Sequence, residues 1–168
     1  LDPTSCDPLY RWEADEIRER IAATYDVILA ETRRNQNEFV WNEIASVDAL
    51  GSLRMAAMED FLADYNTGKM AGRYVDAALP ELPFLDASFD IALSSHLLFL
   101  YTDHLDDMFH FLAVRELCRI AAEVRIFPLL ALGGARSRFV EPIVQVFTHL
   151  GFWVTIERVA YEFQRGGN

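Results

Sequence analysis

The chain has 168 residues, a formal net charge of −11 at pH 7 and 52% hydrophobic residues. This composition excludes an intrinsically disordered chain and predicts one globular domain with a sizeable core. The acidic charge, with no basic cluster to reverse it locally, argues against nucleic acid as a partner. The longest apolar run, residues 91–101, is interrupted by polar residues and is far shorter than the roughly 20 residues of a membrane span. We therefore expect a soluble, cytoplasmic protein that binds no membrane.

The two cysteines, Cys6 and Cys118, lie far apart in the sequence and form no CxxC pair. This spacing argues against both a disulfide framework and a zinc site. We expect each cysteine to be a small buried side chain.

The first half of the chain has the apolar periodicity of α-helices. Residues 13–34 repeat apolar side chains at three- and four-residue steps, which predicts an amphipathic helix. A second helical region is predicted over residues 38–66, with a joint at 46–51 where Ser46 or Asp48 is a suitable N-cap. Gly68 and Gly72 are expected to mark its end.

After Gly72 the pattern alternates between strands and helices. In chain order we expect a strand over 73–78, a proline-containing loop over 79–84, a buried strand over 89–95, a helix over 103–122, a strand over 123–130, a turn at Gly133 and Gly134, a helix over 137–150 and a strand over 152–159. This alternation predicts an α/β fold with a doubly wound, mostly parallel sheet. We expect a single domain over 1–168, with a sheet core at 71–168 and a helical insertion at 13–70 that either covers a site as a lid or thickens the outer layer.

Two segments resemble the class I S-adenosylmethionine-dependent methyltransferases. Leu82, Pro83 and Phe84, followed by the sequence Asp-Ala-Ser-Phe-Asp at 86–90, are similar to the family's Leu-Pro-Phe segment, its short turn and its fourth strand. Residues 4–10 resemble the end of the family's second strand, where an acidic residue binds the ribose hydroxyls, and Asp7 matches that position. The order of the elements after residue 90 agrees with the family's fourth to sixth strands.

The resemblance implies a cofactor site for S-adenosylmethionine. Asp7 would bind the ribose, Leu82, Pro83 and Phe84 would lie near the adenine, and Ser94 and Ser95 would lie in the cleft at the end of a strand. A carboxylate at the end of a parallel strand is also chemically suited to two ribose hydroxyls. The residues alone leave a second interpretation open, in which Asp7 opens a turn or caps the following helix.

The chain departs from the family pattern in two places. The family's glycine-rich loop would precede Leu1, so we expect a sheet that lacks its first strand and a sequence that is cut at both ends. A gap of this kind in a sheet could be filled by a second copy, as in a homodimer. The family also often has an acidic residue four positions before Leu82, where this chain has Ala78; Asp76 is close but out of phase along the strand.

Polar and aromatic residues that follow the strand at 89–95 are candidates for the acceptor site. His96 is a candidate general base and Tyr101 a candidate wall of the acceptor pocket, together with Phe99 and Phe109. The alternative is that the serines satisfy loop backbone groups, His96 caps the next helix, and the aromatic residues belong to the core.

Two further groups of residues allow a functional interpretation. His104, Asp107 and His110 have a spacing that suits a metal ion, but we favour a helix start capped by Asp103 and predict no metal site. Arg125 and Arg165 could pair with a ligand carboxylate. We favour pairing of Arg125 with Glu123 or Glu116, and exposure of Arg165.

We therefore expect an enzyme that transfers a methyl group from S-adenosylmethionine to a small molecule or another acceptor. The alternative is a non-catalytic or truncated methyltransferase fold whose helical insertion and open sheet edge mediate self-association. A metal-dependent hydrolase that uses His104 and His110 is a third hypothesis.

Overall fold

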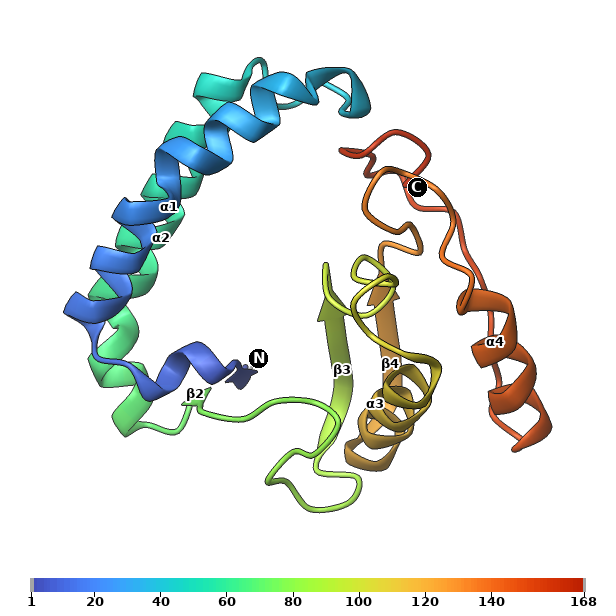
Figure 1. Ribbon diagram of the computed structural model, residues 1–168. Coiled ribbons are helices and arrows are strands. Elements are labelled where there is room, and N and C mark those ends of the chain that lie inside the picture. Colours follow the sequence, from blue (N-terminus) through green and yellow to red (C-terminus); the bar gives the residue numbers. More distant parts are fainter. Residues whose placement is uncertain (1, 168) are drawn as a thin grey trace. The chain divides into compact units, whose positions relative to one another are not determined.

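A computed structural model describes residues 2–167 (Figure 1). The chain divides into two units, Leu1–Ala78 and Leu79–Asn168. Each unit contains one pair of parallel strands joined by helical segments. Parallel strands need a long crossover connection, and helices supply it in both units.

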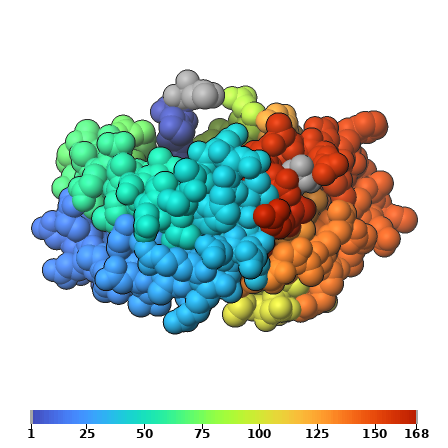
Figure 2. Space-filling model, turned by 90° about the horizontal axis from the view of Figure 1, so that it is seen from above, coloured from blue at the N-terminus to red at the C-terminus, as the bar shows by residue number. Residues whose placement is uncertain are grey.

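In the first unit, strand β1 (Ser5–Cys6) lies parallel to strand β2 (Tyr74–Val75). The connection between them contains the 3₁₀-helix η1 (Pro8–Arg11), helix α1 (Ala14–Arg34), the 3₁₀-helix η2 (Gln36–Glu38) and helix α2 (Val47–Met70). Helices α1 and α2 lie side by side, and their atoms are in contact along the helices in the space-filling view (Figures 1 and 2).

The ends of α1 and α2 follow from local capping. A capping box joins Glu13 and Glu16 at the start of α1, where the Glu13 N–H donates to Glu16 Oε2 at 2.9 Å. Ser46 caps α2 by accepting the Ala49 N–H at 3.1 Å. The predicted joint is therefore confirmed at Ser46, whereas the predicted helix start at residue 38 is wrong, because residues 39–46 are not helical.

A cluster of aromatic and aliphatic side chains in the first unit joins η1, the start of α1 and the second half of α2. Its buried members are Tyr10, Ile17, Leu62 and Tyr65. The Tyr65 hydroxyl donates to the carbonyl oxygens of Tyr10 at 3.0 Å and Trp12 at 2.8 Å. Tyr65 thus fastens η1, and the strand end that precedes it, to α2.

Gly68 is required where α2 passes β2. A Cβ atom at this position would lie 2.4 Å from Cε2 of Tyr74 and 2.8 Å from Cδ2 of the same ring. Glycine-to-alanine changes within helices usually stabilise by about 0.5–1 kcal/mol. We expect the opposite sign for Gly68→Ala, a loss of about 1–3 kcal/mol, because the Tyr74 ring must move. Urea unfolding measures the loss, and an increase in the free energy of unfolding would contradict the close contact.

In the second unit, strand β3 (Phe89–Ser95) is followed by helix α3 (Asp107–Ile120), strand β4 (Ala121–Phe127) and helix α4 (Val140–His149). Strands β3 and β4 are parallel, in a register from Phe89 opposite Ala121 to Ser95 opposite Phe127. One face of this pair packs on α3 through Ala92, Val124 and Ile126, and the buried core comprises Leu98, Ala113, Val114, Leu117 and Phe147.

These observations confirm the α/β class, the position of the strand at 89–95 and the order of helix, strand and helix that follows it. The strand is not buried as predicted, because Leu93 on its outer face is 72% exposed. Some predictions are wrong. Residues 152–159 form no strand among the described residues, and the Trp153 side chain is 92% exposed. A strand needs a backbone partner, and no other described strand hydrogen-bonds to this segment. The described strands also form two separate pairs rather than a full doubly wound sheet.

The start of α3 differs from the prediction as well. Asp106, not Asp103, is its N-cap, and the Asp106 Oδ1 accepts the Phe109 N–H at 2.7 Å. Asp103 instead forms an ion pair with Arg138 at 2.6 Å. Among the helices in the described part of the chain, none combines the length and the apolar character that a membrane crossing requires.

Candidate functional site

Two aspartates lie at the carboxyl end of the β1–β2 pair. Cys6 is opposite Val75, and the Asp7 N–H donates to the Val75 carbonyl oxygen at 3.2 Å. Extending this register by one residue brings Asp7 opposite Asp76. Neighbours in register on parallel strands point to the same side of a sheet. Both residues are exposed.

Asp7 caps η1, as the second interpretation of this residue predicted. Its Oδ1 accepts the Leu9 N–H at 2.7 Å, and its backbone is extended. A carboxylate has two oxygens and about four acceptor sites, so this cap does not exhaust its capacity. Capping and ligand binding by Asp7 are therefore compatible.

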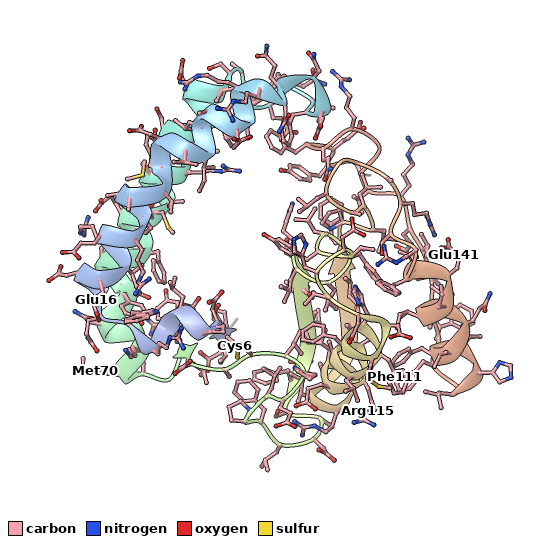
Figure 3. The ribbon with its side chains drawn as sticks, viewed as in Figure 1. Cys6, Glu16, Met70, Phe111, Arg115 and Glu141 are labelled. Carbon is pink, nitrogen blue, oxygen red and sulfur yellow. The ribbon has the colours of Figure 1, made fainter. Side chains whose placement is uncertain are left out.

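The strand end that carries Asp7 is firmly held. The Tyr10 hydroxyl and Ser5 Oγ lie 2.7 Å apart, and burial raises the pKa of Tyr10, which keeps its hydroxyl protonated. Cys6, labelled in Figure 3, is a free, half-buried thiol whose pKa is raised by burial. Cys118 is likewise free, with a pKa raised by burial, so both cysteines are half-buried rather than fully buried as expected.

At the end of β3, Ser95 and His96 form a hydrogen-bonded pair. Ser95 Oγ lies 2.7 Å from His96 Nδ1. The backbone N–H of His96 donates to the Phe127 carbonyl oxygen at 2.7 Å, and the two rings lie 5.7 Å apart. His96 has a φ of 55°. Residues other than glycine rarely adopt this backbone conformation, and those that do are frequently found at functional sites. His96 does not cap α3, because Asp106 does, so that alternative is wrong.

Ser94 differs from its neighbour because it is buried. Its side chain is 8% exposed, and its Oγ has no hydrogen-bond partner among the described residues. The alternative in which both serines satisfy loop backbone groups therefore does not hold for Ser94. Ser95 is exposed at the carboxyl end of β3, where open α/β sheets bind their ligands.

The aromatic residues after His96 divide between core and surface. Phe99 is buried and Phe109 is half-buried against the core of the second unit, so their core role is confirmed. Tyr101 is 40% exposed, and its ring lies 6.0 Å from the ring of His104. Tyr101 is therefore the aromatic residue of this group that remains accessible to a ligand.

The loop that follows β3 is fastened to the loop that follows β4. The Leu132 N–H donates to the Leu100 carbonyl oxygen at 3.0 Å. Thr102 Oγ1 and Ser137 Oγ lie 2.6 Å apart in a hydrogen bond, and both hydroxyl groups belong to buried residues. These contacts hold the segment that carries Tyr101.

Leu82, Pro83 and Phe84 form a loop that is bonded to α3 rather than to a strand. The Leu82 N–H donates to Glu116 Oε1 at 2.7 Å, and Arg119 donates to the carbonyl oxygens of Leu82 and Phe84. Sequence reasoning missed both α3 residues in this role. The sequence does show a glutamate and an arginine three positions apart on a predicted helix. This spacing does not indicate that their partners are the backbone groups of a distant loop.

The three residues with metal-ligand spacing serve different purposes. His110 is fully buried between the carbonyl oxygens of Leu98 and Asp106, whereas His104 is exposed. Asp107 accepts the Met108 N–H at 2.9 Å. The described residues contain no group of three side chains that could hold a metal ion. Arg125 pairs with Glu123 at 2.5 Å, which was the favoured interpretation.

No known protein-family model and no solved structure matches the chain. It is 36% identical over 166 residues to the uncharacterized protein MJ0045 of Methanocaldococcus jannaschii, and the match covers 98% of this chain and 72% of that protein. This identity extends over both units, so the chain belongs to the same family as the uncharacterized protein MJ0045.

Proposed function

We propose that this protein binds S-adenosylmethionine and transfers its methyl group to an acceptor. The observation that carries the proposal is that two exposed aspartates, Asp7 and Asp76, directly follow β1 and β2 at the carboxyl ends of this parallel strand pair. Ligands of open α/β sheets bind at such ends. Carboxylate oxygens accept hydrogen bonds from ribose hydroxyls and from an adenine amino group.

The proposal extends to the fold. We propose a doubly wound, mostly parallel sheet, as the resemblance to class I methyltransferases implies. Asp7 would bind the ribose, the loop at 82–84 would lie along the adenine, and Ser95 would lie in the cleft. The parallel pairing and the helical crossovers in both units support this extension.

The chemistry proposed for the second unit is the removal of a proton from the acceptor. Bound S-adenosylmethionine supplies a methyl group on a positively charged sulfur. A lone pair of the acceptor would form the new bond to the methyl carbon, and the sulfur would keep the electrons of the carbon–sulfur bond. His96 Nε2 would take the acceptor proton, with Nδ1–H donating to Ser95 Oγ, which lies 2.7 Å away. Tyr101 would contact the acceptor.

Calorimetric titration of S-adenosylmethionine and S-adenosylhomocysteine into the protein tests the proposal. We expect saturable binding of both, and no binding of NAD⁺, which also contains an adenosine group, at the same concentrations. The absence of binding by either S-adenosyl compound would overturn the proposal. Binding of all three compounds alike would indicate a general adenosine site rather than this cofactor.

A second candidate function is self-association without catalysis. The face of β3 that points away from α3 carries Ile91, which is 45% exposed, and Leu93, which is 72% exposed. Exposed apolar strand residues favour association with another chain. Light scattering tests this candidate: a dimer that Leu93→Asp converts to a monomer would support it, and a wild-type monomer at micromolar concentration would exclude it.

A further inference from the structure

We propose that Glu116 and Arg119 of α3 are positioning residues, which set the conformation of the loop at 82–84 and thereby the adenine affinity of the site. The inference rests on the proposed function, because that function places the adenine on this loop. The effect on the loop itself does not depend on any ligand.

The geometry shows that two side chains satisfy three backbone groups of the loop. Glu116 Oε1 accepts the Leu82 N–H at 2.7 Å. Arg119 Nη2 donates to the Leu82 carbonyl oxygen at 3.2 Å, and Arg119 Nη1 donates to the Phe84 carbonyl oxygen at 2.8 Å. In a strand these groups would bond to a neighbouring strand, whereas here α3 provides their partners.

The two side chains are also fixed relative to each other. Arg119 Nε and Nη2 donate to the two carboxylate oxygens of Glu116 at 2.8 and 2.7 Å, and Nη1 donates to Asp86 at 2.8 Å. The Glu116 side chain is only 13% exposed, so this is not an ordinary surface ion pair. A planar guanidinium serves all these acceptors at once, which a lysine ammonium group cannot do in the same geometry.

The charge of Glu116 is stabilised by the same contacts. The Arg119 guanidinium and the Leu82 N–H hold the pKa of the Glu116 carboxyl below its usual range. Glu116 is therefore ionised at neutral pH, and its stabilising effect is lost as the pH falls through this lowered pKa. The hydrogen bonds of Glu116 and Arg119 to the loop are therefore present at the neutral pH at which the proposed cofactor would bind.

Packing holds the side chains of the loop, so the orientation of its backbone groups depends on Glu116 and Arg119. Leu82 packs against the core of the second unit, and the Phe84 ring lies edge-on to the Phe89 ring at 4.9 Å. Pro83 has no N–H to donate. Without Glu116 and Arg119 the side chains would remain anchored, but the carbonyl groups of the loop could rotate.

The test compares Arg119→Lys with Arg115→Lys, a matched control one turn earlier on α3, where Arg115 is exposed (Figure 3). Glu116→Gln and Glu116→Ala complete the series, because Gln retains an acceptor for the Leu82 N–H. Two quantities are measured at a temperature where every variant is folded by circular dichroism. They are the amide hydrogen exchange of peptides covering residues 82–88 and the Kd for adenosine and S-adenosylhomocysteine.

We expect faster exchange in the loop and about a tenfold weaker Kd for both ligands in Arg119→Lys, the size of a lost hydrogen bond to a charged group. Glu116→Gln should lose less affinity than Glu116→Ala, and Arg115→Lys should match the wild type. Unchanged exchange in Arg119→Lys would overturn the inference. Faster exchange with an unchanged Kd would also overturn it while the proposed function stands.

If the wild type binds neither ligand, the proposed function and the role of Glu116 and Arg119 in the loop can still be judged separately. Such a result overturns the proposed function and the adenine part of the inference. The exchange data then still decide whether Glu116 and Arg119 set the loop conformation.

Discussion

Asp7→Asn is expected to weaken the binding of S-adenosylmethionine and S-adenosylhomocysteine by about 100-fold. A carboxylate accepts hydrogen bonds from both hydroxyls of one ribose, and each bond to a charged group contributes about 1.5–3 kcal/mol. The amide of Asn has one oxygen, and its NH₂ group can only donate. One ribose hydroxyl would therefore lose its acceptor, and the charge would be lost from the other bond. Calorimetric titration measures the change.

The choice of Asn separates binding from folding. Asp7 caps η1 by accepting the Leu9 N–H, and Asn is an equally good N-cap. The Tm of Asp7→Asn should therefore match that of the wild type. Asp60→Asn, an exposed position on α2, serves as the charge-matched control and should bind as the wild type does. Wild-type affinity in Asp7→Asn would show that the ribose does not contact this carboxylate.

Local patterns in the sequence predicted most of the helices and the long strands. Ile17 and Leu29 lie on the buried face of α1 because a period of three to four residues places them there. The apolar run at 89–95 became β3, although its outer face is exposed at Leu93 rather than buried. Such patterns depend on neighbouring residues, which is why they can be recognised without a structure.

Contacts between distant residues could not be predicted in the same way. Leu82 and Glu116 are 34 positions apart, and nothing in the sequence identifies the partner of either. The register of β1 and β2 is likewise a long-range property, and it is this register that brings Asp76 beside Asp7.

The predicted start of α3 was wrong because several aspartates could serve as its N-cap. Asp103, Asp106 and Asp107 all suit the N-cap of α3 by residue type. Residues 101–104 are instead held in turns, where the His104 N–H donates to the Tyr101 carbonyl oxygen at 2.9 Å. The helix therefore starts later, and Asp106 is the aspartate whose carboxylate reaches the Phe109 N–H.

His110→Leu is expected to lower the free energy of unfolding by about 2–4 kcal/mol. Nε2 of the fully buried ring lies 2.9 Å from the Leu98 carbonyl oxygen, and Nδ1 lies 2.7 Å from that of Asp106. Leucine has a similar size but donates no hydrogen bond, so the Leu98 carbonyl oxygen would be left buried without this partner. The ring also packs 4.4 Å from that of Phe139. Urea unfolding measures the loss.

His104→Leu is the matched control, because both histidines belong to the sequence pattern that suits a metal ion. His104 is exposed, so its replacement should change the free energy of unfolding by less than about 0.5 kcal/mol. A structural role for His110 thus predicts a large difference between the two variants. If the two histidines shared a metal ion, both variants would lose that ion and the same amount of stability. Equal losses would therefore contradict the structural role that the burial of His110 between two carbonyl oxygens indicates.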